Sequence, residues 1–142
     1  MEPLERYRSI IDDFDAFLAA CKRPLGNAVR VNTIKASVER TLAALDREGV
    51  GYDQADWNPR VLDLETDSPG STWTSFHGWT HGQEEVSAVP AVVLDPQPGE
   101  RVWDSCAAPG GKATQLAALM DDRGTVVAND NNLGRISALR FN

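Results

Sequence analysis

One stretch of the sequence, from Arg101 to Asp130, constrains the possible fold more than any other. It follows a turn, Asp95-Pro96-Gln97-Pro98-Gly99, in which proline fixes φ and glycine permits a reversal, so a strand is expected over residues 101–105. Apolar residues at helical spacing predict a helix over residues 112–120, and turn residues ending in a glycine follow it. A second strand over residues 125–129 then leads to Asp130.

The order strand, glycine loop, helix, strand and acid is typical of the first unit of a doubly wound, Rossmann-like α/β sheet. Ligands of such sheets lie beyond the carboxyl ends of the strands. Gly110 and Gly111 have no Cβ, so a ligand can approach their backbone, and the free N–H groups of a helix that begins near Lys112 favour an anion. Asp130, at the end of the next strand, can accept hydrogen bonds from both ribose hydroxyls.

Two common nucleotide loops are excluded by what this loop lacks. A P-loop needs a glycine five residues before Gly111 and a Ser or Thr after the lysine, but Cys106 and Ala113 occupy those positions. The dinucleotide fingerprint G-x-G-x-x-G is also absent, because Gly110 and Gly111 are adjacent and no third glycine follows in the helix. The loop is therefore expected to hold a ligand with a compact charged end and not a pyrophosphate.

The loop Asp104-Ser105-Cys106-Ala107-Ala108-Pro109-Gly110-Gly111-Lys112 resembles the cofactor loop of the Sun-family (RsmB-like) RNA cytosine-5 methyltransferases. The resemblance spans roughly residues 25–142 and departs from the family pattern at Ala113, where Thr or Ser is usual, and at Trp103, where an aliphatic residue is common. Four further patches agree in order and spacing: Arg30-Val31-Asn32-Thr33; Gly78-Trp79 with Gln83 and Ser87; Leu94-Asp95-Pro96-Gln97-Pro98-Gly99-Glu100; and Ala128-Asn129-Asp130 with Arg135, Leu139 and Asn142.

This resemblance implies S-adenosylmethionine as cofactor and RNA as partner, with tRNA ahead of rRNA. The cofactor-binding residues that it implies are Cys106, Ala107, Ala108, Pro109, Gly110, Gly111, Lys112, Asp130 and Arg135. Two of these roles stay open at this point. Lys112 either donates to the methionine carboxylate or caps local carbonyls, and Arg135 either contacts the cofactor or orients Asp130.

No catalytic residue is expected within these 142 residues. Methylation of cytosine at C5 requires a thiolate that adds at C6. In the resembling family this thiolate and its helper cysteine come from later Pro-Cys and Thr-Cys-Ser motifs, and the sequence contains neither motif. Cys106 stands where the family's cofactor loop also has a cysteine, so binding or packing is its expected role.

A complete doubly wound methyltransferase also needs more strands and helices than residues 83–142 can supply. We therefore expect the N-terminal portion of a larger enzyme: a fragment, a split gene product or a truncated one. Such a chain should not catalyse methyl transfer by itself, and the missing C-terminal half would be a partner. Unpaired sheet edges and an uncovered apolar face should make it prone to aggregation or dependent on that partner.

The sequence divides into a small α+β domain, residues 1–82, and a truncated cofactor domain, residues 83–142. The first is expected to resemble an RNA-binding domain. It begins with a predicted helix over residues 4–21 whose apolar face includes Cys21 as a core residue. Strands are expected over residues 28–32 and 61–64, separated by a helix that is capped by Ser37 and closed by Gly49.

Residues 65–82 have the composition of a loop, and residues 83–94 that of a helix with Ser87 as its cap and Pro90 near its first turn. His77 and His81 have the spacing of a helical metal pair, but their neighbouring glycines and the lack of other ligands favour ordinary loop histidines and no metal. Trp73 and Trp79 could stack on RNA bases, but a role in sealing the domain junction is favoured.

The charge balance conflicts with RNA binding, because the net charge is −7 and a nucleic-acid binder should show a basic surface. One hypothesis is adaptation to high salt, where acidic surfaces keep proteins soluble; the other is that the basic surface lies in sequence outside these residues.

No apolar run could span a bilayer, no signal peptide is visible, and two distant cysteines suggest no disulfide scaffold. A cytoplasmic location is the resulting expectation.

Three functions remain open from the sequence. The first is the S-adenosylmethionine-binding part of an RNA cytosine-5 methyltransferase. The second is a non-catalytic RNA-binding or assembly module that kept the loop without the catalytic cysteines. The third, a remnant of a small-molecule methyltransferase, is disfavoured because the N-terminal patches match the RNA enzymes.

Overall fold

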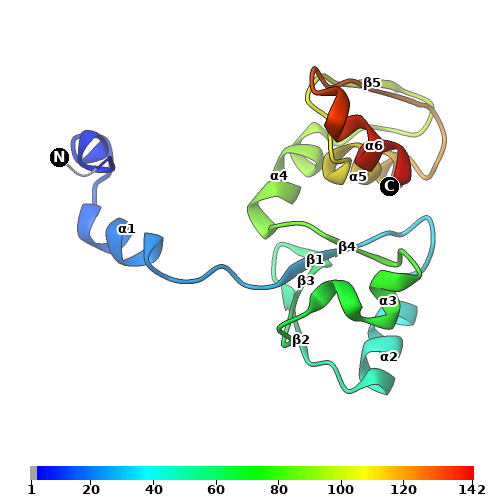
Figure 1. Cartoon of the computed structure of the whole chain (residues 1–142), viewed down its shortest axis with the longest axis horizontal. Helices are drawn as coiled ribbons and strands as arrows, with labels where there is room; N and C mark the ends of the chain where they lie inside the picture. The colour runs from blue at the N-terminus through cyan, green and yellow to red at the C-terminus, as the bar shows by residue number, and fades with distance from the viewer. Residues whose placement is uncertain (1–2) are drawn as a thin grey trace.

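The computed structural model describes residues 3–142, which form two sheet-containing units and an N-terminal helical segment (Figure 1). The first unit contains an antiparallel sheet with strand order β2-β3-β1-β4. Its strands are β1 (Ala28–Val31), β2 (Tyr52–Ala55), β3 (Asn58–Leu64) and β4 (Thr80–Gly82). β1 therefore lies inside the sheet, between β3 and β4.

Helix α2 (Val38–Glu48) covers one face of this sheet. It begins as predicted, because the Ser37 hydroxyl accepts a hydrogen bond from Arg40 N (3.2 Å), and it ends at Gly49 with φ +73°. The core between helix and sheet consists of Val29, Val31, Leu45, Leu62 and Leu64, all buried.

The second unit contains α4 (Glu85–Leu94), β5 (Arg101–Asp104), α5 (Gly111–Leu119), β6 (Thr125–Ala128) and α6 (Leu133–Phe141). The strands β5 and β6 are parallel, in register from Arg101 opposite Thr125 to Asp104 opposite Ala128. The predicted strand, helix and strand are confirmed to within one residue at each end. The predicted cap of α4 is wrong: Glu84 is the N-cap, and Ser87 and Pro90 both lie inside the helix.

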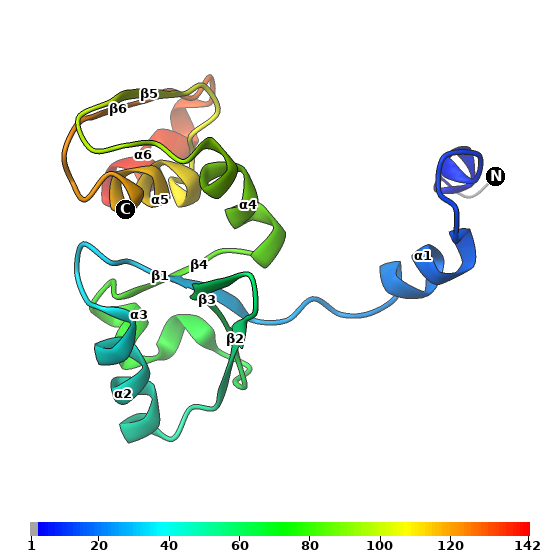
Figure 2. The ribbon, with the colours of Figure 1, turned by 180° about the vertical axis from the view of Figure 1, so that it is seen from behind.

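The outer face of the β5-β6 pair is bare. Trp103 is 71% exposed and its cross-strand neighbour Val127 is 53% exposed. In Figures 1 and 2, helices α4, α5 and α6 all lie on the other side of these strands. The expected uncovered apolar face is therefore present.

The N-terminal segment differs from its prediction. Instead of one helix over residues 4–21, it forms the short 3₁₀ turn η1 (Glu5–Tyr7) and the helix α1 (Phe14–Cys21), and it extends away from both units (Figure 2). Asp13 interrupts the helix, because its carboxylate accepts from Ala16 N (2.8 Å) and starts a new one. Within its apolar stripe Phe14 is buried, but Ile10 is 74% exposed, and Cys21 is exposed and not a core residue.

The prediction of a loop over residues 65–82 is also wrong. This segment forms η2 (Pro69–Ser71), the short helix α3 (Trp73–Phe76) and β4. β4 pairs with β1, with Thr80 opposite Val31 and Gly82 opposite Val29.

No helix within residues 3–142 has the length and apolar character needed to span a membrane.

Candidate functional site

The loop between β5 and α5 is held by the ends of both parallel strands. Cys106 N donates to the Asp104 carboxylate (3.2 Å), and Ala107 N donates to the carbonyl of Asn129 (2.8 Å). Asn129 N in turn donates to the carbonyl of Asp104 (2.8 Å). These bonds fix the loop at the carboxyl edge of the sheet, where ligands of such folds bind.

Asp130 joins the same loop directly. Its Oδ2 accepts from Ala108 N (3.1 Å), and its Oδ1 accepts from Asn132 N (2.9 Å). The Asn132 N–H, then the Ala108 N–H and the nearby Arg135 guanidinium, lower the pKa of this carboxyl despite its burial. Asp130 therefore remains a carboxylate that braces the loop, at the position predicted for a ribose acceptor.

Arg135 also contacts the loop. One guanidinium nitrogen lies 3.7 Å from Asp130 Oδ2, and the other donates to the carbonyl of Ala108. Arg135 is thus paired with Asp130, as the orienting role, one of the two left open by the sequence, would require. A contact between Arg135 and a cofactor remains a prediction.

The two loop glycines have different surroundings. Gly110 adopts φ +119°, and a Cβ there would lie 3.3 Å from Asn142 Cβ. Gly111 has no positive φ, and a Cβ there would meet no protein atom closer than His81 Nε2 at 3.6 Å. The fold itself therefore requires glycine at 110 but not at 111.

The remaining predicted loop residues are divided between the surface and the interior. Ala107 and Ala108 are buried, whereas Cys106, Pro109 and Lys112 are exposed. The Lys112 ammonium has no hydrogen-bond or ion-pair partner within residues 3–142, so capping of local carbonyls is not observed there.

Asp104 has an unsatisfied oxygen that sequence reasoning missed. Its Oδ2 is fully buried and is the one such side-chain atom without a hydrogen-bond partner in the described part of the chain. Buried carboxylate oxygens are normally paired, so this one is an exception among the described residues. The available sequence signal was an acid at the carboxyl end of the strand that precedes the glycine loop.

Arg30 of β1 connects the first unit to the loop helix. Its side chain is 2% exposed and donates to Gln83 Oε1 (2.9 Å), to the carbonyl of Gly111 (3.3 Å) and to Thr114 Oγ1 (3.0 Å). Burial lowers the pKa of this guanidinium to about 10, helped by the neighbouring charge of Arg60. The first turn of α5 is therefore held from the other unit by an arginine.

Two glutamines extend this buried network into α4. Gln83 Nε2 donates to Gln115 Oε1 (2.9 Å), and Gln115 Nε2 donates to the carbonyl of Ala88 (2.9 Å). The Gln83 and Gln115 side chains are both buried. The network joins β1, α4 and α5, so it fills the junction that the tryptophans were predicted to seal.

The prediction for Trp73 is wrong, because Trp73 is 55% exposed and stacks on His77 at 3.8 Å between ring centroids. Trp79 is half-buried beneath the Arg40 guanidinium, 4.4 Å from its ring centroid.

His77 and His81 do not belong to any group of three potential metal ligands within residues 3–142. Burial and the charge of Arg30 lower the pKa of His81.

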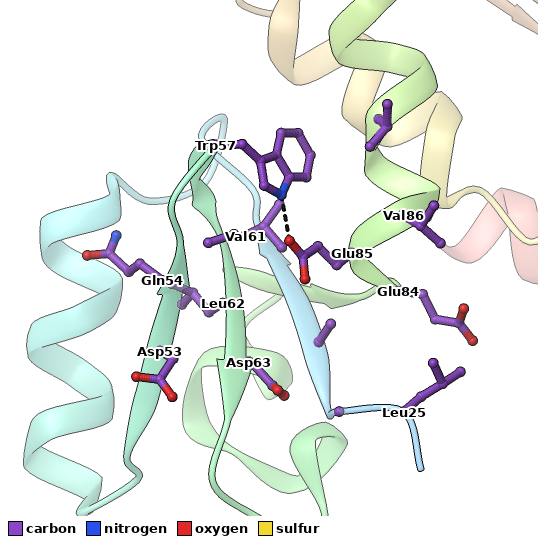
Figure 3. Close-up of a pocket in the computed structure, with 14 residues that line it drawn as sticks. Leu25, Asp53, Gln54, Trp57, Val61, Leu62, Asp63, Glu84, Glu85 and Val86 are labelled. Atoms are coloured by element: carbon purple, nitrogen blue, oxygen red, sulfur yellow. Dashed lines mark hydrogen bonds between the residues drawn. The ribbon is translucent and has the colours of Figure 1, made fainter. Parts of the chain in front are cut away.

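A cavity of about 620 Å³ lies away from the loop (Figure 3). It is a groove between the sheet of the first unit and the start of α4, where Trp57 Nε1 donates to Glu85 Oε1 (2.5 Å). Leu25 and Val86 line it together with four acids: Asp53, Asp63, Glu84 and Glu85. No residue of the loop contributes to this groove.

Comparison with known proteins identifies relatives of the chain. Residues 91–142 match a family model described as 16S rRNA methyltransferase RsmB/F. The chain is 40% identical over 137 residues to the ribosomal RNA small subunit methyltransferase F of Enterobacter sp. (strain 638), covering 91% of this chain and 28% of that protein. The chain therefore spans little more than a quarter of this curated relative.

Comparison with solved structures identifies proteins with the same fold. The crystal structure of PH0851 superposes with a TM-score of 0.87 at 38% identity and covers 97% of this chain and 32% of that one. A methyltransferase homolog from Pyrococcus horikoshii superposes with a TM-score of 0.81 at 38% identity, over 87% of this chain and 41% of that one. The predicted fold class, a Rossmann-like α/β unit preceded by a small α+β part, is confirmed.

Proposed function

We propose, from its similarity to the RsmB/F methyltransferases, that the chain binds S-adenosylmethionine and contributes that site to RNA cytosine-5 methylation. The observation that carries this proposal is the unsatisfied Oδ2 of Asp104, whose other oxygen holds the glycine loop at the carboxyl edge of the sheet. Such a loop suits a ligand with both an anionic and a cationic end.

The residues present fit the amino-acid end of this cofactor. The first amides of α5 carry the partial positive charge of a helix N-terminus and suit a carboxylate. Asp104 Oδ2 can accept a hydrogen bond from the α-ammonium group, which would supply the donor that the protein lacks. Lys112, exposed beside the same turn, adds a positive charge for the carboxylate.

The sugar end is assigned to Asp130. A carboxylate oxygen can accept two hydrogen bonds, and Asp130 Oδ1 has one from Asn132 N, so one further donor can be taken from a ribose hydroxyl. Arg135 holds this carboxylate in place. When bound, the cofactor would supply an electrophilic methyl group, and the chain's residues would bind and orient it.

We assign no nucleophile to this chain. Cys21 lies on α1, apart from the loop (Figure 1), and Cys106 is part of the loop itself. The thiolate that adds to cytosine C6 is therefore assigned to the part of such enzymes that these residues do not span. We expect no methyl transfer by these 142 residues alone.

For the RNA, the names of the relatives favour ribosomal RNA of the small subunit, and we adopt it as the proposed substrate. General family resemblance favoured tRNA, which remains the alternative. Competition between the two RNAs for the complete enzyme would decide between them. A second function, a non-catalytic RNA-binding or assembly module, is suggested by the positions of the two cysteines, Cys21 on α1 and Cys106 within the loop.

Isothermal titration calorimetry with S-adenosylmethionine tests the proposal. The wild-type chain should bind, and Asp104→Asn, which keeps the acceptor for Cys106 N but removes the charge, should weaken binding by about tenfold, or ~1.4 kcal/mol. Asp121→Asn is the matched control, because Asp121 is exposed and outside the loop. No binding by the wild-type chain would contradict cofactor binding and favour the non-catalytic module.

A further inference from the structure

A second cavity, about 350 Å³, lies between the two units and beside the glycine loop. We call it the interdomain cleft; its lining includes Asn32, Lys35, Phe76, His81, Thr114 and Asn142. The residues come from the β1-α2 turn, α3, β4, α5 and α6. In Figures 1 and 2 the carboxyl end of α6 faces β4 across this region.

The charge of the cleft is opposite to that of the molecule. The chain has a net charge of −7 with histidine counted as neutral, yet the cleft lining contains Lys35 and no acidic residue. The large groove shows the reverse, with four acids and no lysine, arginine or histidine. The local charge of the cleft therefore suits an anion better than the rest of this acidic protein does.

Lys35 is placed for such a contact. Its exposed ammonium has no hydrogen-bond or ion-pair partner in the described part of the chain. The missing side chain of Gly78 makes room for it, because a Cβ there would lie 2.6 Å from Lys35 Nζ. An unpaired lysine at a cleft can contact a phosphate as a point charge.

Phe76 adds an aromatic surface. It is 83% exposed, and its ring lies 5.1 Å from that of His77, which stacks in turn on Trp73. A supported and exposed aromatic ring in the same cleft as a free cation is typical of sites where an unpaired base stacks and its phosphate is neutralised.

The cleft reaches the glycine loop. His81 Nε2 lies 3.6 Å from the position of a Cβ at Gly111, and Asn142 Nδ2 donates to the carbonyl of Pro109 (2.8 Å). Thr114, on the first turn of α5, lines the cleft and also accepts from Arg30. A ligand in the cleft would therefore lie beside the proposed cofactor loop.

We propose that the interdomain cleft binds a single-stranded RNA segment, with one base stacked on Phe76 and a backbone phosphate on Lys35. This inference rests on the proposed function, because it places RNA next to the S-adenosylmethionine loop. An acidic protein segment could use the same cations, but it would not require the exposed ring of Phe76. The aromatic and the cation together favour RNA.

Fluorescence anisotropy with a short labelled oligocytidylate tests the cleft on the whole chain. Phe76→Ala should weaken binding at least about fivefold, the lower range for loss of one stacked base. Lys35→Gln should also weaken binding and should reduce the slope of log K against log salt by about 0.7, as expected for one phosphate contact with a single strand. Circular dichroism of each variant checks that the fold is retained.

Two matched controls make the result specific. Trp103→Ala removes an exposed aromatic ring from the bare sheet face, and Lys22→Gln removes an exposed lysine near α1. Both should bind the oligonucleotide as the wild type does. The proposal is overturned if the wild type does not bind, if Phe76→Ala and Lys35→Gln bind normally, or if the controls weaken binding equally. S-adenosylmethionine binding of the wild type, measured separately, tests the proposed function without the cleft.

Discussion

At the scale of single residues, Gly110 and Gly111 are adjacent but are glycines for different reasons. The φ of +119° at Gly110 is unfavourable for any residue with a Cβ, so Gly110→Ala should cost about 1–2 kcal/mol of folding free energy. Gly111 has space for a methyl group within the protein, so Gly111→Ala should leave the free energy of unfolding nearly unchanged and weaken S-adenosylmethionine binding. Urea denaturation and calorimetry of both variants measure these effects.

Each variant serves as the control for the other. If Gly111→Ala bound the cofactor like the wild type, the ligand would not approach the loop backbone at that position. If it lost as much stability as Gly110→Ala, the protein itself would require glycine there, and the separation of the two roles would be incorrect.

His81 should make stability depend on pH. Its pKa is lowered from 6.5 by burial and by Arg30, so the unfolded chain binds a proton that the folded chain resists. Above pH 6.5 His81 is neutral in both states and does not change the free energy of unfolding. As pH falls from 6.5 toward the folded pKa, protonation of the unfolded chain lowers the free energy of unfolding. Thermal unfolding should show a falling midpoint over that window, and His81→Asn should reduce the fall; an identical profile in the variant would exclude His81 as its source.

Residue identity in the site was only partly predictable. The glycines and Asp130 could be found because a short stretch fixes both their spacing and their strand ends. Asp104 and Arg30 could not be assigned roles in this way. The unsatisfied oxygen of Asp104 and the bonds from Arg30 to Gly111 and Thr114 exist only once distant segments pack together.

At the scale of elements, β1 and α5 are coupled through Arg30. Arg30→Met should leave Gln83 Oε1 without its buried donor, remove one of the two side-chain donors to the carbonyl of Gly111, and cost about 2–3 kcal/mol, as for hydrogen bonds to a charged group. Denaturant unfolding measures this loss. Arg60→Met is the matched control: its guanidinium makes no hydrogen bond within residues 3–142, and its charge repels Arg30.

The changes in the free energy of unfolding caused by Arg30→Met and Arg60→Met should therefore differ in sign or in size. Arg60→Met should be neutral or slightly stabilising, because it removes a repulsion. Equal losses in both variants would mean that the buried network around Arg30 contributes nothing beyond general packing.

The elements that sequence reasoning missed have a common cause. β2 (Tyr52–Ala55) lacks a clear apolar alternation, and β4 (Thr80–Gly82) lies in a segment rich in Gly, Ser and Thr. Both are strands because a neighbour supplies the ladder of hydrogen bonds: β3 for β2 and β1 for β4. In contrast, α2 was predictable because its cap, its apolar face and its closing glycine are all local.

The N-terminal helix shows the opposite error. Its apolar periodicity over residues 4–21 was real, but a helix of this kind is stabilised mainly by the surface on which its apolar face packs. The local cap at Asp13 decides where the helix begins. The sequence signal that could have revealed this was Asp13 followed by the first-turn acid Asp15.

At the scale of the whole molecule, the bare face of β5 and β6 should promote self-association. Replacing Trp103 and Val127 together with threonine keeps a residue suited to strands and removes the exposed apolar surface. Sedimentation velocity should then show fewer oligomers than the wild type at equal concentration. Unchanged association, with an unchanged circular dichroism spectrum, would assign it to another surface.

The acidic balance of the molecule is distributed unevenly. The four acids of the large groove and the acid-free interdomain cleft show that a net charge of −7 does not describe each surface. An RNA-facing site can therefore exist on this chain despite its overall charge. Adaptation to high salt remains a prediction from composition.

The central claim is that S-adenosylmethionine binds the backbone of the glycine loop. Titration of the ¹⁵N-labelled chain with this compound, followed by amide chemical shifts, tests it most directly. The largest shifts should fall on Gly110, Gly111 and Lys112, with Asp130 also affected. Shifts confined to the groove around Leu25 and Trp57, or none at the loop, would contradict the account.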